Sequence, residues 1–405
     1  MKKIFFSILL MTAMVNTQAQ NPFFKAYKTP NGTPPFDKIK NEHYEPAFDK
    51  GMAEHAEEIK KITTSKEAPT FKNTIEAYEK SGKLLSNVAT VFFNLLSSES
   101  NDEMMDISQR LSPKLSEHQN NISLNEDLFK RVKAVYDTRK SSNLTPEQIR
   151  LTEKIYEGFE DSGATLSADK KETYRKLSTD LSQLTLDFGQ NALKHVNQYE
   201  MLLTSEADLA GLPKDVIDAA AAKTKAKEKE GWLFDLSAPS YIAFMKYSTR
   251  RDLRERLYMA SSTKCVGGDF DNQANIIGIV NTRLQIANLF GYPDYATYSL
   301  RDKMAKNKEG VFKLLDQLHK AYAIAARSDV KEVEGYAVGV ENAPITIQPW
   351  DWAFYSEKLK SAKYSVNDEI VRPYFELENV KKGVFGLATD LYGITFKKNP
   401  KIPVY

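Results

Sequence analysis

The sequence has little of what local catalytic motifs require. Cys265 is the one cysteine among 405 residues, so no disulfide forms within the chain and its stability must come from a packed core. Its thiol follows Lys264 and has no histidine nearby in sequence, which is typical of a small buried hydrophobic residue rather than of a nucleophile. A Gly-x-Ser-x-Gly elbow, a Gly-x-x-x-x-Gly-Lys loop and a Cys-x-x-Cys pair are all absent. The local signatures of serine hydrolases, P-loop enzymes and dithiol oxidoreductases are therefore missing.

An excess of charge of one sign is also lacking. The chain has 56 basic and 54 acidic residues. Without Lys2 and Lys3, which lie in the first 19 residues, the two numbers are equal and the remaining chain has no net charge. The lysines between Ala219 and Lys229 are interleaved with Glu228 and Glu230, so we interpret them as a solvated helix face. Nucleic acid is therefore not an expected partner.

The first 19 residues have the pattern of a secretory signal peptide. Lys2 and Lys3 precede an apolar run from Ile4 to Val15, and the short polar end Thr17-Gln18-Ala19 follows. The run is too short to anchor the chain across a bilayer, and no cysteine follows it to carry a lipid. We therefore expect cleavage after Ala19, no membrane anchor and an exported, periplasmic protein.

Hydrophobic periodicity predicts a mainly α fold with minor β strands. Apolar residues at steps of three and four predict helices over most of the chain, among them Tyr44 to Ile62, Thr70 to Lys80, Leu84 to Leu96 and Leu124 to Tyr136. Thr145-Pro146-Glu147-Gln148 predicts a helix start, because it combines an N-cap, a first-turn proline and a capping-box glutamine. Ser167 is expected to open a long helix that packs lengthwise against a partner.

Strands and loops are predicted at few places. Period-two patterns predict short strands at 199–203 and 232–236, and a loop is expected at Asn120 and Asn121. Near the end, Trp350 is expected to open one helix and Gly393 to end another. The residues from Ile394 to Tyr405 alternate as strand residues do, so a strand is predicted there.

Five blocks along the chain have a specific composition and order. They are PPFDKIKNEHYEPAF from Pro34, APTFKNTI from Ala68 with Phe92-Phe93-Asn94-Leu95, GWLFDLSAPSYIAFMKYSTRRDLRERLY from Gly231, GYPDYATYSLRDKMAK from Gly291, and the stretch from Gln348 to Tyr405. In this order the blocks resemble the M3 zinc peptidases of the peptidyl-dipeptidase (dipeptidyl carboxypeptidase) type. The last block resembles the segment just upstream of that family's zinc-binding helix. The blocks span nearly the whole chain after residue 19.

The resemblance implies a helical, two-lobed peptidase fold, here incomplete. We divide the chain into a signal peptide at 1–19, an N-terminal helical lobe at 20–235 and the beginning of a truncated catalytic domain at 236–405. The family's zinc is held by His-Glu-x-x-His and a downstream glutamate, with the intervening glutamate activating water. The implied partners are short unstructured peptides, and the complete protein is expected to be a monomer.

The zinc motif itself is absent from this chain. Its five histidines are far apart, and none has a second histidine at the four-residue spacing: His43, His55, His118, His195 and His319. His55 and Glu58 lie one turn apart, but zinc needs three or four ligands, so we interpret His55 as a packed residue. We therefore assign no catalytic, cofactor-binding or metal-binding residue, and we expect the zinc ligands beyond residue 405.

Aromatic residues are the remaining candidates for a peptide channel. Five of them are singled out, although aromatics at helical spacing belong more often to a core: Tyr298, Trp350, Trp352, Tyr355 and Tyr374. Three hypotheses remain: the amino-terminal part of a peptidyl-dipeptidase, a non-catalytic peptide-binding or scaffold protein of the same fold, and an oligopeptidase-type endopeptidase. Release of dipeptides from a free carboxyl end separates the first from the third.

The mature amino terminus can be tested directly. Because the run from Ile4 to Val15 ends in small and polar residues, expression in a secreting bacterial host should yield a protein that begins at Gln20. Mass spectrometry of the purified product checks this. A product that begins at Met1 and stays in the cytoplasm would overturn the predicted export.

Overall fold

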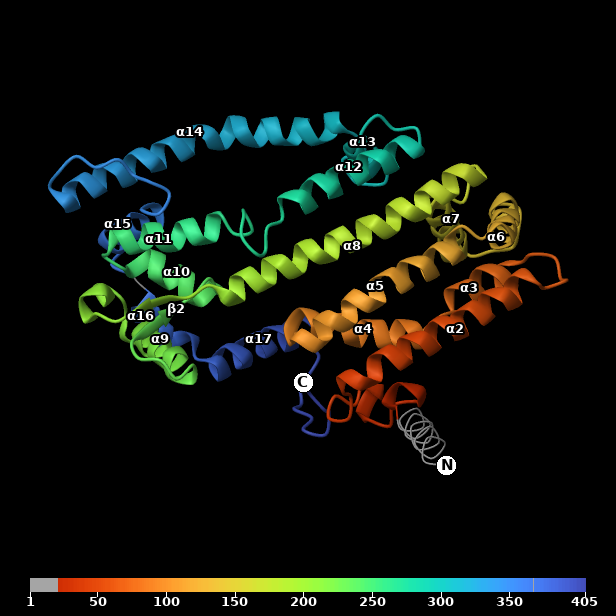
Figure 1. The fold of residues 1–405 in the computed structure, drawn as a ribbon, viewed down its shortest axis with the longest axis horizontal. Coiled ribbons are helices and arrows are strands. Elements are labelled where there is room, and N and C mark those ends of the chain that lie inside the picture. Colours follow the sequence, from red (N-terminus) through yellow and green to blue (C-terminus); the bar gives the residue numbers. More distant parts are fainter. Residues whose placement is uncertain (1–20, 367) are drawn as a thin grey trace, which may run out of the picture. The chain divides into compact units, whose positions relative to one another are not determined.

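A computed structural model of the chain describes residues 21–366 and 368–405. The predicted signal peptide at 1–19 lies outside the described residues. The chain divides into two compact units. Figure 1 labels the helices and strands of the chain in sequence order. Unit 1 comprises the residues up to Asp187, with Gly278–Tyr298 and Lys398–Tyr405, and unit 2 comprises Phe188–Ile277 and Ser299–Lys397. The described residues are mainly helical and contain a single two-stranded sheet, which confirms the predicted fold class.

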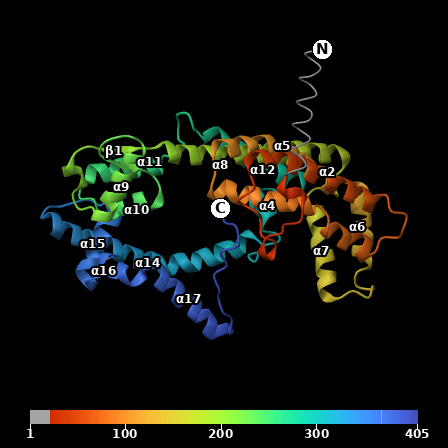
Figure 2. The same cartoon turned by 90° about the horizontal axis from the view of Figure 1, so that it is seen from below.

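Unit 1 is built from helices. Its main elements are α2 (Tyr44–Thr63), α4 (Lys83–Ser98), α5 (Asp102–Ser123), α6 (Glu126–Thr138), α7 (Pro146–Asp161) and the first part of α8 (Ala168–Gln198). Short turns complete it, namely η1 (Pro22–Phe24), η2 (Pro30–Gly32), η3 (Asn41–His43), η4 (Phe71–Glu76) and α3 (Ala77–Glu79). Helix α2 packs against α4 and α5, and α6 lies beside α7 (Figure 2).

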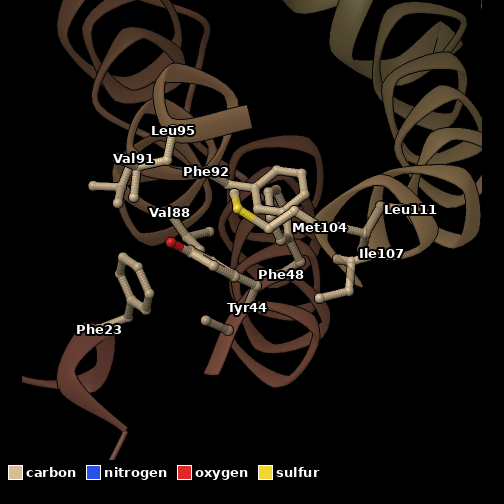
Figure 3. Close-up of a cluster of buried hydrophobic side chains, with 11 residues drawn as sticks. Phe23, Tyr44, Phe48, Val88, Val91, Phe92, Leu95, Met104, Ile107 and Leu111 are labelled. Carbon is tan, nitrogen blue, oxygen red and sulfur yellow. The ribbon is translucent and has the colours of Figure 1, made fainter. Parts of the chain in front are cut away.

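The most extensive helix–helix contact among the described residues of unit 1 is between α2 and α4. Gly51 permits it, because a Cβ at that position would come within 2.9 Å of the Leu85 backbone. The aromatic rings of the two helices then interlock, with Phe48 edge-on to Phe92 at 5.6 Å between ring centroids. Figure 3 shows the resulting core, which α5 closes with Met104, Ile107 and Leu111. The apolar face predicted from Tyr44 to Ile62 therefore lies inside this unit.

The long helix α8 contacts α5 through polar side chains. Ser178 accepts a hydrogen bond from Asn120 at 2.9 Å, Thr179 lies 3.2 Å from Ser116, and Asp187 accepts one from Gln109 at 2.9 Å. The partner numbers run in opposite directions, so the two helices are antiparallel. The predicted lengthwise partner therefore exists, and hydroxyl and amide groups make these contacts.

Unit 2 combines the sheet with a second set of helices. Strand β1 (Met201–Leu203) pairs with β2 (Trp232–Phe234) in antiparallel register, so the two predicted strands are confirmed. Around it lie η5 (Glu206–Leu209), α9 (Lys214–Ala226), α10 (Ala238–Tyr247) and α11 (Arg251–Ser262), which gather in Figure 2. The remaining elements are α12 (Gln273–Leu289) and α13 (Tyr295–Leu300), which belong to both units, and α14 (Lys308–Glu341), α15 (Trp352–Tyr364), α16 (Asp368–Val371), η6 (Arg372–Phe375) and α17 (Leu377–Tyr392).

Helix-boundary predictions are confirmed where the chemistry is local. Thr145 and Gln148 form a reciprocal capping box at the start of α7. Ser167 immediately precedes α8, and Gly393 ends α17 with φ 67°. The segment from Phe71 to Glu76 begins as a π-helical turn behind the capping residue Thr70, and α-helical geometry follows only at Ala77.

Two boundary predictions are wrong. Helix α5 continues through Asn120 and Asn121 to Ser123, because the buried Asn120 amide is paired with Ser178 and does not compete for the helix backbone. The segment from Ile394 to Tyr405 forms no strand. Phe396 instead stacks on Phe385 of α17 at 4.3 Å, and Tyr405 lies edge-on to Phe36 at 5.1 Å.

Adjacent phenylalanines in α4 test the core of unit 1. Phe92 is fully buried, whereas Phe93 is 44% exposed. Phe92→Ala should lower the free energy of unfolding by about 3–5 kcal/mol, because it removes buried apolar contacts and leaves a cavity. Phe93→Ala is the matched control and should cost roughly 1 kcal/mol or less. Urea unfolding followed by circular dichroism measures both, and equal losses would contradict the assigned core.

Candidate functional site

The histidine singled out for its neighbour Glu58 has other partners. Glu58 accepts a hydrogen bond from the Gly82 backbone N–H at 2.7 Å, and His55 contacts Ser81 and His118. Within residues 21–366 and 368–405, no group of three or more His, Cys, Asp or Glu side chains is placed to hold a metal ion. The described residues therefore do not fit the zinc site that the resemblance implies.

Cys265 is buried in a turn. It has a positive φ of 60°, and the Asn272 N–H donates to its backbone carbonyl at 2.9 Å. Burial raises the pKa of the thiol, with a smaller opposing effect from Lys264. A thiol in this environment stays protonated at neutral pH, which is the opposite of what an attacking cysteine needs.

The five aromatic residues do not form one cluster. Tyr298 lies in unit 1, stacks on Phe290 at 5.1 Å and donates a hydrogen bond to the Asp161 carbonyl. The other four lie in unit 2 and differ in exposure: Tyr355 is buried, Trp350 is half-buried, and Trp352 and Tyr374 are exposed. Two of the five are therefore exposed, Trp352 by 40% and Tyr374 by 77%.

The buried Tyr355 is held by a carboxylate. Its hydroxyl donates to Glu341 Oε1 at 2.7 Å, which ties α15 to the end of α14. Burial raises the pKa of this hydroxyl, and the Glu341 bond raises it further. Tyr355 is therefore a neutral donor that fixes the two helices, rather than a titrating group at neutral pH.

An ion-pair hub fixes the start of α15. Asp351 is fully buried and accepts hydrogen bonds from Arg251 at 2.7 Å and from Arg254 at 2.9 Å. Arg254 is itself 1% exposed, and it also donates to the Trp350 carbonyl at 3.1 Å and the Ser248 carbonyl at 2.7 Å. Its guanidinium lies 4.2 Å from the centre of the Phe354 ring. The hub therefore satisfies the buried arginine and the buried carboxylate together.

The protonation state of the hub follows from its donors. Burial alone would raise the pKa of Asp351, but bonds from Arg251, the Gln348 backbone and Arg254 outweigh it and hold the pKa below its ordinary value. The carboxylate is therefore charged at neutral pH. Its stabilising contribution is present above the unfolded-state pKa and is lost as the pH falls through the lowered folded-state pKa.

A cavity of about 680 Å³ lies beside this hub in unit 2. Its basic and aromatic lining residues are Lys214, Lys246, Lys358, Tyr247, Tyr336 and Phe354. Glu357 also lines it and is only 8% exposed, with Lys246 at 3.4 Å and Lys360 at 2.8 Å. Ammonium and hydroxyl donors beside aromatic rings suit the carbonyls and carboxylates of a peptide.

Two helices of unit 2 expose apolar faces. On α17, four apolar residues at helical spacing are 38–64% exposed: Val380, Val384, Leu387 and Leu391. On α14, several large apolar residues are 50–71% exposed: Phe312, Leu314, Leu315, Tyr322 and Ile324. Apolar surface of this extent is typical of a contact with another part of a protein.

No helix within the described residues is long and apolar enough to cross a membrane.

Comparison with known proteins shows that this sequence is similar to those of peptidases. Residues 244–405 match the model of "Peptidase family M3". Dipeptidyl carboxypeptidase of Escherichia coli K12 is 35% identical over 388 residues, which are 95% of this chain and 57% of that protein. Oligopeptidase A of the same organism is 31% identical over 385 residues, covering 93% of this chain and 56% of that protein. The chain thus spans little more than half the length of these relatives.

The ion-pair hub yields a stability prediction. Asp351→Asn should lower the free energy of unfolding by about 3–5 kcal/mol, because Arg254 stays buried without its counter-charge. Asp252→Asn is the control, since Asp252 is 63% exposed in its pair with Arg250 and such pairs contribute about 0–1 kcal/mol. Urea unfolding of both variants measures the difference. A loss for Asp351→Asn no larger than the control's would show that the hub is not a determinant of stability.

Proposed function

The chain belongs to peptidase family M3, and from that membership we propose that it is the amino-terminal part of an exported zinc metallopeptidase of the peptidyl-dipeptidase type. The observation that carries the proposal is the 35% identity to a dipeptidyl carboxypeptidase across 95% of this chain. The proposed substrates are short unstructured peptides, and the proposed product is the dipeptide at the free carboxyl end. Export rests on the signal-peptide pattern of the first 19 residues.

The proposed zinc ligands lie outside the described residues. Support comes from the lack of any three-ligand cluster within 21–366 and 368–405, and from relatives of which this chain covers little more than half. When bound, zinc would supply a Lewis acid and an activated water for amide hydrolysis. We propose that further sequence after residue 405 in the complete protein carries His-Glu-x-x-His and a glutamate ligand.

The proposed roles of this chain are to bind peptide and to support the rest of the enzyme. In this proposal, the lysines and tyrosines of the unit 2 cavity hold peptide carbonyls and carboxylates, and the exposed apolar faces of α14 and α17 pack against the further sequence. Charge-assisted hydrogen bonds to a terminal carboxylate would favour peptides with a free end. The boundary between an N-terminal helical lobe at 20–235 and a catalytic domain from 236 onward is part of the same proposal.

Two alternatives have observations in their favour. The similarity to oligopeptidase A supports an endopeptidase that cuts within the peptide. The unit 2 cavity needs no metal to bind a ligand, which supports a peptide-binding or scaffold protein of the same fold. The endopeptidase would cleave free and amidated peptides alike. The scaffold protein would bind peptides and cleave neither.

Metal content and product analysis test the proposal. The 405-residue chain should hold no stoichiometric zinc after dialysis and should cleave no peptide. The complete gene product should release dipeptides from a peptide with a free carboxyl end, and do so about tenfold or more faster than from its amidated form, because the amide loses a charged hydrogen bond.

Each other outcome has a definite meaning. One tightly held zinc per 405-residue chain, with chelator-sensitive hydrolysis, would show that distant residues of this chain assemble the site. Equal rates on free and amidated peptides would replace the peptidyl-dipeptidase by the endopeptidase. A reading frame that stops directly after Tyr405, with a compact and abundant product, would favour the binding protein.

A further inference from the structure

Helices α2 and α5 of unit 1 run parallel and are joined by a ladder of polar side chains. Arg110 donates two hydrogen bonds to Glu45, at 3.0 and 2.7 Å, and Lys114 lies 3.0 Å from Asp49 one turn further along. The third rung is different, because both partners are histidines. His118 Nε2 lies 3.1 Å from His55 Nδ1, with the ring centroids 5.1 Å apart.

The surrounding hydrogen bonds fix which nitrogens carry protons. The Ser81 hydroxyl donates to the Tyr78 carbonyl at 2.6 Å, so it accepts from His55 Nε2 at 3.1 Å. A neutral imidazole has one N–H, so His55 Nδ1 is the bare nitrogen and accepts from His118 Nε2–H. His118 Nδ1 is then also bare. The bonds thus run in one direction, from His118 through His55 and Ser81 to Tyr78.

This order decides what each added proton does. The first proton can enter at the bare Nδ1 of His118, and every hydrogen bond of the series is kept. A second proton must enter at Nδ1 of His55, which then presents an N–H to the N–H of His118. The bond between the helices is lost, and two like charges face each other at the same contact.

We propose that the His55–His118 contact is a pH-sensitive clamp between α2 and α5, closed while no more than one imidazole is charged and released when both are charged. Release would separate the helices at the end of the ladder that has no opposite-charge pair. It would also open a cavity of about 550 Å³ that His118 lines together with Leu85, Asn120, Tyr174 and Ser178.

The neighbouring charges set the direction of the titration. Burial lowers the pKa of His55, against a smaller upward effect of Glu58 on the same helix. Burial also lowers the pKa of His118, and the nearby His55 lowers it further. Tyr174 of α8 stays neutral because its pKa is raised to about 12, and the residues of α4 that line the cavity, Leu85, Ala89 and Phe93, are uncharged.

The sign of the pH dependence follows from these directions. Both imidazoles bind protons less readily in the folded than in the unfolded protein. Their contribution to stability is therefore fully present above the unfolded histidine pKa of about 6.5 and is lost as the pH falls through the lowered folded-state values. Rungs of opposite charge, such as Glu45 with Arg110, keep their attraction over this range because Arg110 holds the pKa of Glu45 below its ordinary value.

The first measurement is a histidine-selective NMR titration of the whole chain. His118 should take up its proton before His55, and both should titrate below the unfolded histidine pKa of about 6.5. Loss of α2–α5 contacts should accompany the second protonation only. Cross-linking between one cysteine introduced beside His55 on α2 and another introduced beside His118 on α5 measures this loss. Titration of His55 and His118 independently of each other, at the unfolded histidine pKa of about 6.5, would overturn the clamp, and this measurement needs no histidine variant to fold.

The second measurement compares variants by urea unfolding from about pH 7 to about pH 5. In wild type, each imidazole that the fold holds neutral lowers the folding equilibrium constant by up to about tenfold for each pH unit by which the pH falls below the unfolded histidine pKa. His118→Gln keeps a donor for His55 Nδ1 but cannot become charged. The folding equilibrium constant of this variant should therefore depend on pH less steeply than that of wild type, by up to about tenfold per pH unit. His319→Gln is the control and should match wild type. Identical pH dependence in the two variants would overturn the proposal.

Discussion

The buried carboxylate of Asp351 is the constraint on which the architecture of unit 2 depends. A charge without solvent contact is tolerated only with full compensation, and here Arg251, Arg254 and a backbone N–H provide it. The cost of leaving any one of them unpaired forces α11 and the start of α15 into one arrangement. Phe354 and Tyr355 follow directly in sequence and enter the small core with Val333 and Ala337 of α14. One ion-pair hub thus positions three helices.

Unit 1 reaches its arrangement by different means. Its helices are held by the interlocked rings of α2 and α4, by the polar ladder between α2 and α5, and by the amide and hydroxyl contacts between α5 and α8. Apolar contacts set the distances between helices, whereas the polar contacts fix their register. Among these contacts, we propose that the His55–His118 rung changes from attractive to repulsive as the pH falls into the mildly acidic range.

The sequence was sufficient for structure that depends on local chemistry. Helical periodicity located most helices, the Thr145–Gln148 box located a helix start, and period-two patterns located β1 and β2. The strand predicted at the end of the chain failed because alternation shows only that a segment could form a strand, whereas a strand also needs a partner. Phe396 instead stacks on the Phe385 ring.

The candidate sites depend on pairs that are distant in sequence. Asp351 meets Arg254 across 97 positions, and His118 meets His55 across 63. No local pattern marks either pair, so sequence reasoning assigned no role to Asp351 and paired His55 with Glu58. The family resemblance predicted more than local patterns could, because it depends on ordered blocks along nearly the whole chain and not on any single contact.

The placement of the aromatic residues also makes the two units optically distinct. The three tryptophans of the sequence are Trp232, Trp350 and Trp352, and all of them belong to unit 2. Unit 1 therefore contributes tyrosine emission alone. Trp350 packs near Tyr258, and Trp352 begins the helix anchored by Asp351, so the tryptophan spectrum reports on the surroundings of the ion-pair hub. Excitation selective for tryptophan therefore follows unit 2 without labels.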